Sequence, residues 1–221
     1  MTITLHHAHE ARSFRALWLL EEMGLDYELK VHNFFDKSLR SPEYLAINPA
    51  ARVPALEIDG QIMCESGASV EYLCELYPEK GLGRPVGDPE RMEYLDMLHY
   101  AESIGQHVAN LTQAHIVLYK PEMRSPTQMS LEARRLHKVL ERMERLLGDG
   151  REYLMASGFS GADCAVGYGV EIARKFIPFD ALPNCAAYAA RVAARPAYQR
   201  ALPSEDVQRI YKKEFYEAPD V

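Results

Sequence analysis

The sequence predicts a fold of class α/β plus all-α, in which a small domain of strands and helices precedes a helical bundle. Three observations support this prediction. Strand-like and helix-like stretches alternate over the first third of the chain, "YPEKGLGRPVGDPE" is crowded with proline, glycine and charged residues, and only helical periodicity follows it. The expected units are a domain at 1–79, a linker at 80–88 and an all-helical domain at 89–221.

The elements of the first unit follow from periodicity and turn residues. Their expected order is strand, helix, strand, short helix, strand, strand, helix. Gly24 closes the first helix, Asp59 and Gly60 supply a hairpin turn, and Pro78 stops the last helix. The expected strands are 2–7, 27–34 and a hairpin of 54–60 with 61–66, and the longer helices are 15–23 and about 67–77.

The second unit is expected to contain four helices. These span 89–119, 130–147, 161–176 and 184–195, and the last of them ends before Pro196. Ser160 and Asp163 have the spacing of a capping box at the start of the third helix, so we assign them to folding.

Composition argues against several classes of protein. The 221 residues are 48% hydrophobic and carry a formal net charge of −7, which argues against a nucleic-acid binder with a basic surface. No apolar run approaches the roughly 20 residues of a membrane span, and the opening lacks the pattern of a secretory signal. Four cysteines without CxxC spacing disfavour a disulfide framework and a zinc site. We therefore expect a cytoplasmic protein that binds neither nucleic acid nor membrane.

Two short motifs allow both a structural and a functional interpretation. Pro54 in "NPAARVPALEID" is either an ordinary strand-entry proline or a cis proline that leaves the Val53 backbone free to pair with a peptide-like ligand. Glu65 and Ser66 stand where a strand meets a helix. Ser66 either caps that helix or donates to a ligand carboxylate there, while Glu65 receives an ammonium group.

The polar junction after the first strand is a third candidate. A helix that begins near Arg12 and Ser13 presents unpaired N–H groups and a partial positive charge, which suit an anion. Ser13 is equally well placed to be an N-cap without a catalytic role. His7 and His9 share a strand face, but two imidazoles without a third ligand are more typical of core or solvated histidines. No metal is expected.

Together these features resemble the cytosolic glutathione transferases. The resemblance rests on "LHH…RSFRALWLLEEMGLDYEL", "INPAARVPALEIDG", the "ES" before a helix, the linker and "SGADCAVG", in that order over nearly the whole chain. The opening looks closest to bacterial and fungal serine-type members. The resemblance implies a thioredoxin-like domain that binds glutathione as co-substrate, a helical domain that shapes a pocket for a small electrophile, and a homodimer.

The resemblance also implies roles for individual residues. Val53 pairs its backbone with the cysteinyl portion of glutathione beside a cis Pro54, Glu65 and Ser66 hold the γ-glutamyl end, and Arg52 lies near the glycine carboxylate. Tyr100, Ser103 and His107 recur at helical spacing on the first long helix after the linker. They either face the electrophile or pack in the core.

The opening departs from the family at one position. Serine-type relatives tend to read "SRSxR" where this chain has Ala11 first, so the usual activating hydroxyl is absent. The expected catalytic residues are therefore Arg12, which stabilises a thiolate by charge, and Ser13, together with backbone N–H groups of the helix. No cysteine occupies the junction, so the reacting thiol must belong to glutathione.

Two alternatives to the transferase remain at this stage. The first is a glutathione-binding or regulatory protein of the same fold without catalysis, which the loss of the serine favours. The second keeps the glutathione site but changes the reaction to isomerisation, dehalogenation, ether cleavage or disulfide reduction.

Overall fold

The computed structural model describes residues 1–219, so the last two residues of the expected helical domain lie outside the described part. A four-stranded sheet of order β2-β1-β3-β4 forms the first unit. Strand β1 pairs with β2 in parallel and with β3 in the antiparallel direction. The strands are β1 (Ile3–Ala8), β2 (Glu28–His32), β3 (Ala55–Ile58) and β4 (Gln61–Met63). The predicted order of strands and helices is confirmed.

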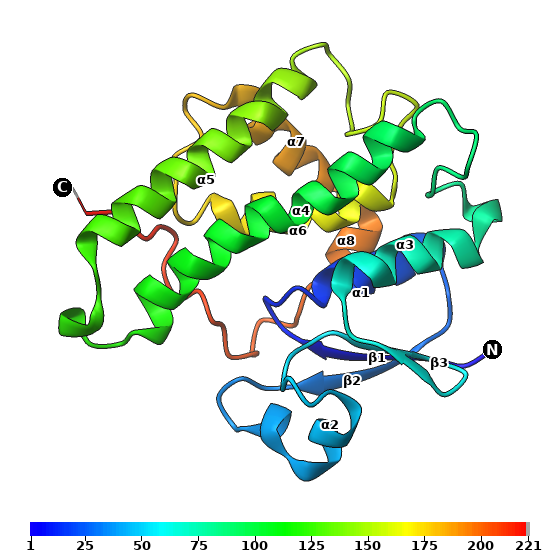
Figure 1. Ribbon diagram of the computed structural model, residues 1–221, viewed down its shortest axis with the longest axis horizontal. Coiled ribbons are helices and arrows are strands. Elements are labelled where there is room, and N and C mark those ends of the chain that lie inside the picture. Colours follow the sequence, from blue (N-terminus) through cyan, green and yellow to red (C-terminus); the bar gives the residue numbers. More distant parts are fainter. Residues whose placement is uncertain (220–221) are drawn as a thin grey trace.

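Two helices cover one face of this sheet and a short one lies on the other (Figure 1). α1 (Phe14–Met23) and α3 (Ser66–Leu76) lie between the sheet and the helical part, and α2 (Pro42–Ile47) lies on the opposite face. α1 ends at Gly24, whose φ of 62° is a left-handed conformation that glycine adopts without a Cβ penalty. A 3-10 turn spans Ser38–Arg40, and another, Pro78–Lys80, follows α3.

The second unit is helical, as predicted. Its long helices α4 (Arg91–Thr112) and α5 (Pro126–Leu147) lie side by side (Figure 1). A π-helical turn, Gln113–Val117, extends α4 over most of the expected range, and a 3-10 turn spans Pro121–Met123. The remaining helices are α6 (Gly161–Ala173), α7 (Pro183–Ala193) and α8 (Pro196–Ala201). The sequence analysis missed α8 because it took Pro196 as a stop, whereas proline is also favoured at the first position of a helix.

The predicted capping box of α6 is confirmed. The Asp163 carboxylate accepts from the backbone N–H of Ser160 at 2.8 Å and from that of Leu154 at 3.0 Å. The buried Tyr188 hydroxyl donates to it as well, at 3.1 Å. Burial raises the pKa of Asp163 to about 6, although these donors act in the opposite direction. Asp163 thus ties the start of α6 to the loop before it and to α7.

α6 packs closely against α1 of the sheet unit and α4 of the helical unit, because glycines stand where these two helices approach it. A Cβ on Gly167 would lie 3.0 Å from the Trp18 ring of α1, and one on Gly169 would lie 3.0 Å from Ile104 of α4. One continuous cluster of buried apolar residues therefore joins the sheet unit to the helical unit. The boundaries predicted at residues 79 and 89 stay a prediction.

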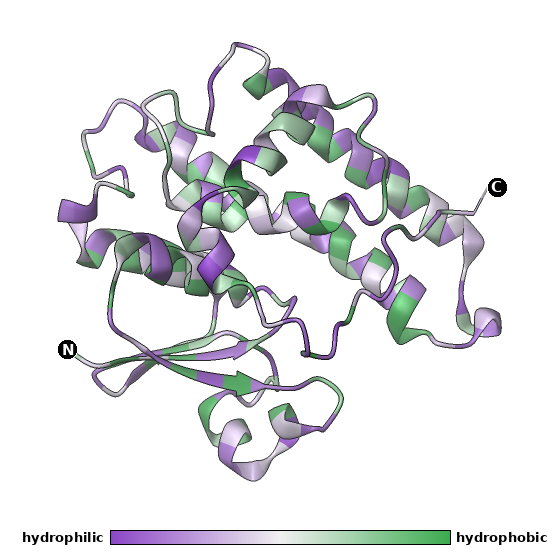
Figure 2. Cartoon of the chain, turned by 180° about the vertical axis from the view of Figure 1, so that it is seen from behind, coloured by the Kyte–Doolittle hydropathy of each residue, from purple (hydrophilic) through white to green (hydrophobic). Residues whose placement is uncertain are grey.

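Polar and apolar residues are interspersed along every helix of the second unit (Figure 2). α5 shows this arrangement most clearly, with its buried residues at helical spacing, among them Leu136, Leu140, Met143 and Leu147. Within residues 1–219, no helix is both long enough and apolar enough to cross a membrane.

Candidate functional site

Two strands end and a third begins at one end of the sheet, which we call the sheet edge. β1 and β2 run in parallel and end there at Ala8 and His32, and the antiparallel β3 begins there, with Ala55 opposite His6. The first turn of α1 follows β1 at the same edge. The residues singled out at positions 11–13 and 52–54 are thereby brought to one place, which we take as the candidate site.

A buried arginine of α1 connects three elements at this edge. The Arg15 side chain is fully buried. Its Nη1 donates to Ser66 Oγ of α3 at 3.0 Å, and its Nη2 donates to the Ala101 carbonyl of α4 at 3.0 Å. Nη1 also pairs with the Glu102 carboxylate. Because a buried guanidinium is stable only beside an opposite charge and hydrogen-bond acceptors, these bonds fix α1, α3 and α4 relative to one another.

Arg12 shares the same carboxylate from the solvent side. Its Nη1 lies 3.0 Å from Glu102 Oε2, its Nη2 donates to the Gly105 carbonyl at 3.2 Å, and its side chain is 38% exposed. Burial alone would raise the pKa of Glu102, but the charges of Arg15 and Arg12 outweigh it and lower that pKa. Two guanidinium groups against one carboxylate leave this junction with an excess of positive charge.

Ser13 is directed into the protein. It stands at the N-cap position of α1, but its side chain makes no capping hydrogen bond. Its buried Oγ lies 2.8 Å from His7 Nδ1, accepts from the Ala8 N–H at 3.2 Å and donates to the Ala8 carbonyl at 3.3 Å. Burial lowers the pKa of His7 to about 3, so this imidazole is neutral. In this arrangement, Ser13 ties the start of α1 to β1.

The loop before β3 has the predicted cis bond between Val53 and Pro54, so that prediction is confirmed. The Arg52 carbonyl is held from both sides, by the Tyr44 hydroxyl at 2.6 Å and by Asn48 Nδ2 at 2.8 Å, while the Arg52 side chain is exposed. Val53 is half-buried and lies two residues before the first ladder pair of β3. Its backbone is therefore at the sheet edge, beside the start of α1.

Glu65 and Ser66 lie where β4 leads into α3. Glu65 is exposed at the N-cap position of α3, without a capping hydrogen bond from its side chain. The structural interpretation of Ser66 as a cap is wrong, because Ser66 is the first residue of the helix and its hydroxyl accepts from Arg15 instead. A hydroxyl that accepts from a guanidinium has its own proton left to donate.

Of the three α4 residues expected to face the electrophile, two bond to α5 and one is exposed. Tyr100 donates to the Val139 carbonyl of α5 at 2.9 Å, and His107 Nδ1 lies 2.7 Å from Oε2 of Glu132, also on α5. Ser103 is exposed. The part of α4 that contacts the site presents Ala101, Glu102 and Gly105.

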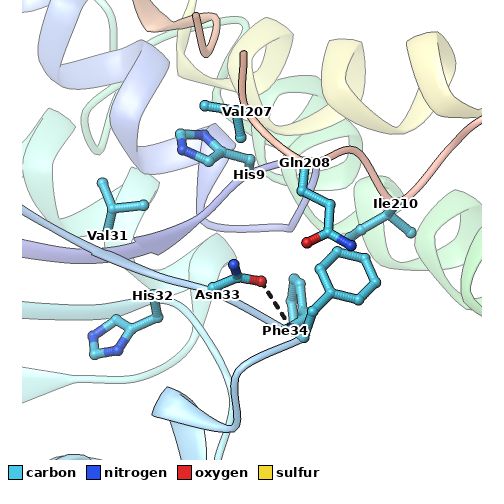
Figure 3. Close-up of a pocket in the computed structure, with 9 residues that line it drawn as sticks. His9, Val31, His32, Asn33, Phe34, Val207, Gln208 and Ile210 are labelled. Carbon is cyan, nitrogen blue, oxygen red and sulfur yellow. Dashed lines mark hydrogen bonds between the residues drawn. The ribbon is translucent and has the colours of Figure 1, made fainter.

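A pocket of about 270 Å³ opens on the β2 side of the junction. Its walls are His9, the segment 31–35 at the end of β2, and residues 207, 208 and 210 of the C-terminal segment (Figure 3). Phe34, Phe35 and Val31 supply apolar surface, and Asn33 and Gln208 supply neutral polar groups. Sequence analysis missed this pocket, because its two sides are more than 170 residues apart along the chain.

Sequence analysis also missed Arg15 and Glu102. The signal for Arg15 was a charged residue between Phe14 and Ala16 in an otherwise apolar helix, which indicates a buried partner. Glu102 gave no comparable signal, since α4 carries acidic residues on several sides. Within the described residues, no cluster of three or more histidine, cysteine or acidic side chains could hold a metal ion.

The sheet order, the cis proline before β3 and the helical second unit define a protein with a thioredoxin-like domain followed by a helical bundle. A family model described as "Glutathione S-transferase, N-terminal domain" matches residues 1–75. A glutathione S-transferase of Hyoscyamus muticus is 31% identical over 197 residues, which cover 85% of this chain and 91% of that protein. The chain belongs to the glutathione S-transferase family.

Two further similarities bear on the site. The crystal structure of a glutathione transferase from Methylococcus capsulatus matches with a TM-score of 0.78 and 29% identity, over 90% of this chain and 97% of that one. The maleylacetoacetate isomerase of Pseudomonas aeruginosa is 45% identical over 73 residues, which are 32% of this chain and 34% of the isomerase.

Replacing Arg15 tests whether its bonds fix the site. R15M keeps the length of the side chain but removes the donor to Ser66 Oγ and to the Ala101 carbonyl, and it leaves Glu102 paired with Arg12 alone. We expect the free energy of unfolding in urea to fall by about 3 kcal/mol, the scale of hydrogen bonds to a charged group and of buried acceptors left unpaired. R174M makes the same change at an exposed arginine and should alter stability by less than about 0.5 kcal/mol. Equal effects of the two variants would contradict the structural role of Arg15.

Proposed function

We propose that this protein is a glutathione transferase that binds glutathione at the sheet edge and promotes attack of its thiolate on a small electrophilic molecule. Membership of the family supports glutathione as the co-substrate. The observation that carries the proposal is the network of Arg12, Glu102, Arg15 and Ser66. This network joins the starts of α1 and α3 at the same end of the sheet as the loop that contains cis Pro54.

Each group of the tripeptide has a matching partner at the site. The Ser66 hydroxyl, with its proton left to donate, and the N–H groups that begin α3 suit the γ-glutamyl carboxylate. Glu65 suits the ammonium group next to it, and the Val53 backbone suits the cysteinyl portion. The exposed Arg52 side chain suits the glycine carboxylate. The charges of the ligand and of the protein are thus complementary from end to end.

The thiol of glutathione is assigned to the start of α1. A thiol is mostly protonated at neutral pH, and each unit by which its pKa falls needs about 1.4 kcal/mol of preferential thiolate stabilisation. Arg12 supplies this by its charge, and the N–H groups of the helix supply it by their dipoles. Ser13 contributes by holding the start of α1 in place, since its hydroxyl is engaged with His7 and Ala8.

In the reaction, the thiol loses its proton to solvent and the sulfur lone pair attacks an electrophilic carbon. A carbon–sulfur bond forms, and the leaving group departs with the bonding electrons. Orientation of the two reactants and stabilisation of negative charge are the contributions of the protein. We assign the electrophile to the pocket between segment 31–35 and residues 207–210. The α4 residues Tyr100, Ser103 and His107 stay predicted contacts only, because Tyr100 and His107 are engaged with α5.

Isomerisation is the second candidate function. The similarity to a maleylacetoacetate isomerase supports it, and such a reaction uses the same glutathione site. The absence of a hydroxyl at Ala11 keeps a binding protein without catalysis as the alternative to both. Turnover assays with aryl halides and with a cis-configured diketo acid distinguish the transferase, the isomerase and the non-catalytic binding protein.

We also propose that the protein is located in the cytoplasm.

Glutathione affinity should depend on the charge of Glu65. E65Q keeps the shape of the side chain but removes the anion that faces the ammonium group, so calorimetry should show a loss of about 1.5 to 3 kcal/mol in binding free energy. E75Q, which neutralises an exposed glutamate in the last turns of α3, is the matched control and should bind as the unmodified protein does. Unchanged affinity of E65Q would remove Glu65 from the site.

Arg12 should control the pKa of bound glutathione more than Ser13 does. R12A removes a partly exposed charge and should raise the thiol pKa by about one unit, as expected for a charge screened by solvent. S13A should change that pKa by less than about 0.3 units, yet lower stability, because it leaves buried groups of His7 and Ala8 unpaired. Titration of the thiolate by ultraviolet absorbance measures both.

Restoring the missing hydroxyl is the complementary control. If turnover of an aryl halide rises in A11S, the natural chain is a transferase with an altered thiol site. Equal and negligible pKa shifts in R12A and S13A, with no gain in A11S, would favour binding without activation.

We also propose that the protein is a homodimer. Large apolar side chains on β4, α3 and α4, namely Ile62, Tyr72 and Met92, are exposed in the single chain. Sedimentation equilibrium at micromolar concentration should give about twice the 25.1 kDa mass of one chain. The mass of one chain at all concentrations would refute the dimer.

A further inference from the structure

The C-terminal segment after α8, residues 202–219, contains neither helix nor strand but lies on the body of the protein (Figure 1). Its later part is anchored by an aromatic cluster in which Tyr211 and Tyr216 pack against Phe176. The Tyr211 hydroxyl lies 2.9 Å from the Thr112 hydroxyl of α4. Residues 203–209, by contrast, make only local hydrogen bonds among the described residues, such as Val207 N–H to the Ser204 carbonyl.

Glu10 holds this segment at the point where the local part meets the anchored part. Its Oε2 accepts from the backbone N–H of Ile210 and, at 3.1 Å, from that of Tyr211. Two N–H donors on one carboxylate oxygen are charge-assisted hydrogen bonds, which are about twice as strong as neutral ones.

The backbone of Glu10 is also constrained. Its φ is 57°, a left-handed conformation that is uncommon for residues other than glycine and is retained only where the surroundings determine it. The Tyr168 hydroxyl of α6 donates to the Glu10 carbonyl at 3.0 Å. Glu10 thus occupies a fixed position between β1 and α1, immediately before Ala11, with its carboxylate turned to the C-terminal segment.

The residues just before this contact form the outer wall of the pocket assigned to the electrophile. Figure 3 shows Val207 beside His9 and shows Gln208 and Ile210 facing Phe34. Residues 203–209 have only local hydrogen bonds, so the wall is held at its C-terminal end by the contact of Ile210 with Glu10 and by the anchored Tyr211. Ile210 itself lines the pocket, so the position of the wall depends on the Glu10 carboxylate that bonds it.

We propose that Glu10 is a positioning residue that determines acceptor specificity, because it holds the C-terminal wall of a pocket that takes an uncharged aromatic acceptor. This inference rests on the proposed function. The nine lining residues include no lysine, arginine or acidic side chain, and Val31, Phe34, Phe35, Val207 and Ile210 provide an apolar lining. A volume near 270 Å³ is large enough for an aromatic acceptor.

The test uses E10A, E10Q and I210P in the full chain. Hydrogen–deuterium exchange measures the contact itself. E10A should speed exchange of the Ile210 and Tyr211 amides about tenfold, the scale of one charge-assisted bond, while exchange in β1 and α1 is unchanged. E10Q keeps an accepting oxygen without the charge and should give an intermediate increase. Unchanged exchange in E10A overturns the proposal.

Acceptor binding is measured by calorimetry in the absence of glutathione, with 1,3-dinitrobenzene and 1,3-dinitronaphthalene, so that no thiolate is present to displace a nitro group. In E10A, affinity for the single ring of dinitrobenzene should fall about tenfold and the preference between this ring and the fused pair should change at least about fivefold. Affinity for glutathione should stay within about twofold. Faster exchange with an unchanged preference between the two rings would show that the wall does not determine specificity, and overturns the proposal.

Two further variants guard against a general loss of structure. I210P removes one of the two donors while Glu10 stays intact, and the double variant E10A/I210P should be no more affected than E10A alone, since both remove the same bond. Y211F, which removes only the hydroxyl bonded to Thr112, should leave the preference between the two rings unchanged. Additive effects of E10A and I210P would overturn the coupling.

These measurements need no turnover. An absence of transferase activity in the unmodified protein would therefore count against the proposed function alone. The exchange and binding results decide the role of Glu10 in either case.

Discussion

The carboxylate of Glu102 links the two units of the protein at the candidate site. It lies on the long helix α4 of the helical unit and pairs with Arg15 of α1 and with Arg12, two residues before α1, in the sheet unit. Arg15 in turn holds Ser66 at the start of α3. The starts of two helices from one unit are therefore positioned by a single acidic side chain from the other. Gly105, one turn further along α4, leaves the space that both guanidinium groups need.

The burial of Arg15 explains why this arrangement needs so many partners. A guanidinium removed from water loses a large hydration free energy, which only well-directed hydrogen bonds and an opposite charge offset. Arg12 is partly exposed and keeps access to solvent and to ligand. The same carboxylate thus supports a buried arginine with a structural role and an outer arginine to which the proposed function assigns the glutathione thiolate.

Local signals account for most of what the sequence predicted. Gly24, the turn at Asp59 and Gly60, and the spacing of Ser160 and Asp163 mark ends and turns through backbone preferences that act over a few residues, and the structure has each of them. The helix α8 was missed because a proline marks the start of a helix as readily as its end. The alternatives for Pro54 and Ser66 could not be separated from sequence, because the bond geometry and the hydroxyl partner depend on the tertiary fold.

The candidate site likewise contains residues that belong to short motifs and residues that are paired only by the tertiary fold. Residues next to the cis proline and at the start of α3 belong to short motifs, so their positions could be read directly. Arg15 and Glu102 are 87 residues apart, and Glu10 and Ile210 are 200 apart. Pairings of this range have no periodicity, and the C-terminal segment has no regular structure to predict. The pocket wall and the ion pairs could be seen only once the chain was folded.

The glycines of α6 have a consequence for how this protein can change. Gly167 faces the Trp18 ring of α1, and Arg15 lies one turn before Trp18 in the same helix, with Arg12 just ahead of the helix. A methyl group on α6 would displace α1, and the displacement would reach these two guanidinium groups. A substitution inside the protein would then move the charged groups of the candidate site by fractions of an ångström. The packing surface of α6 therefore constrains the geometry of that site as well as the fit of the helices.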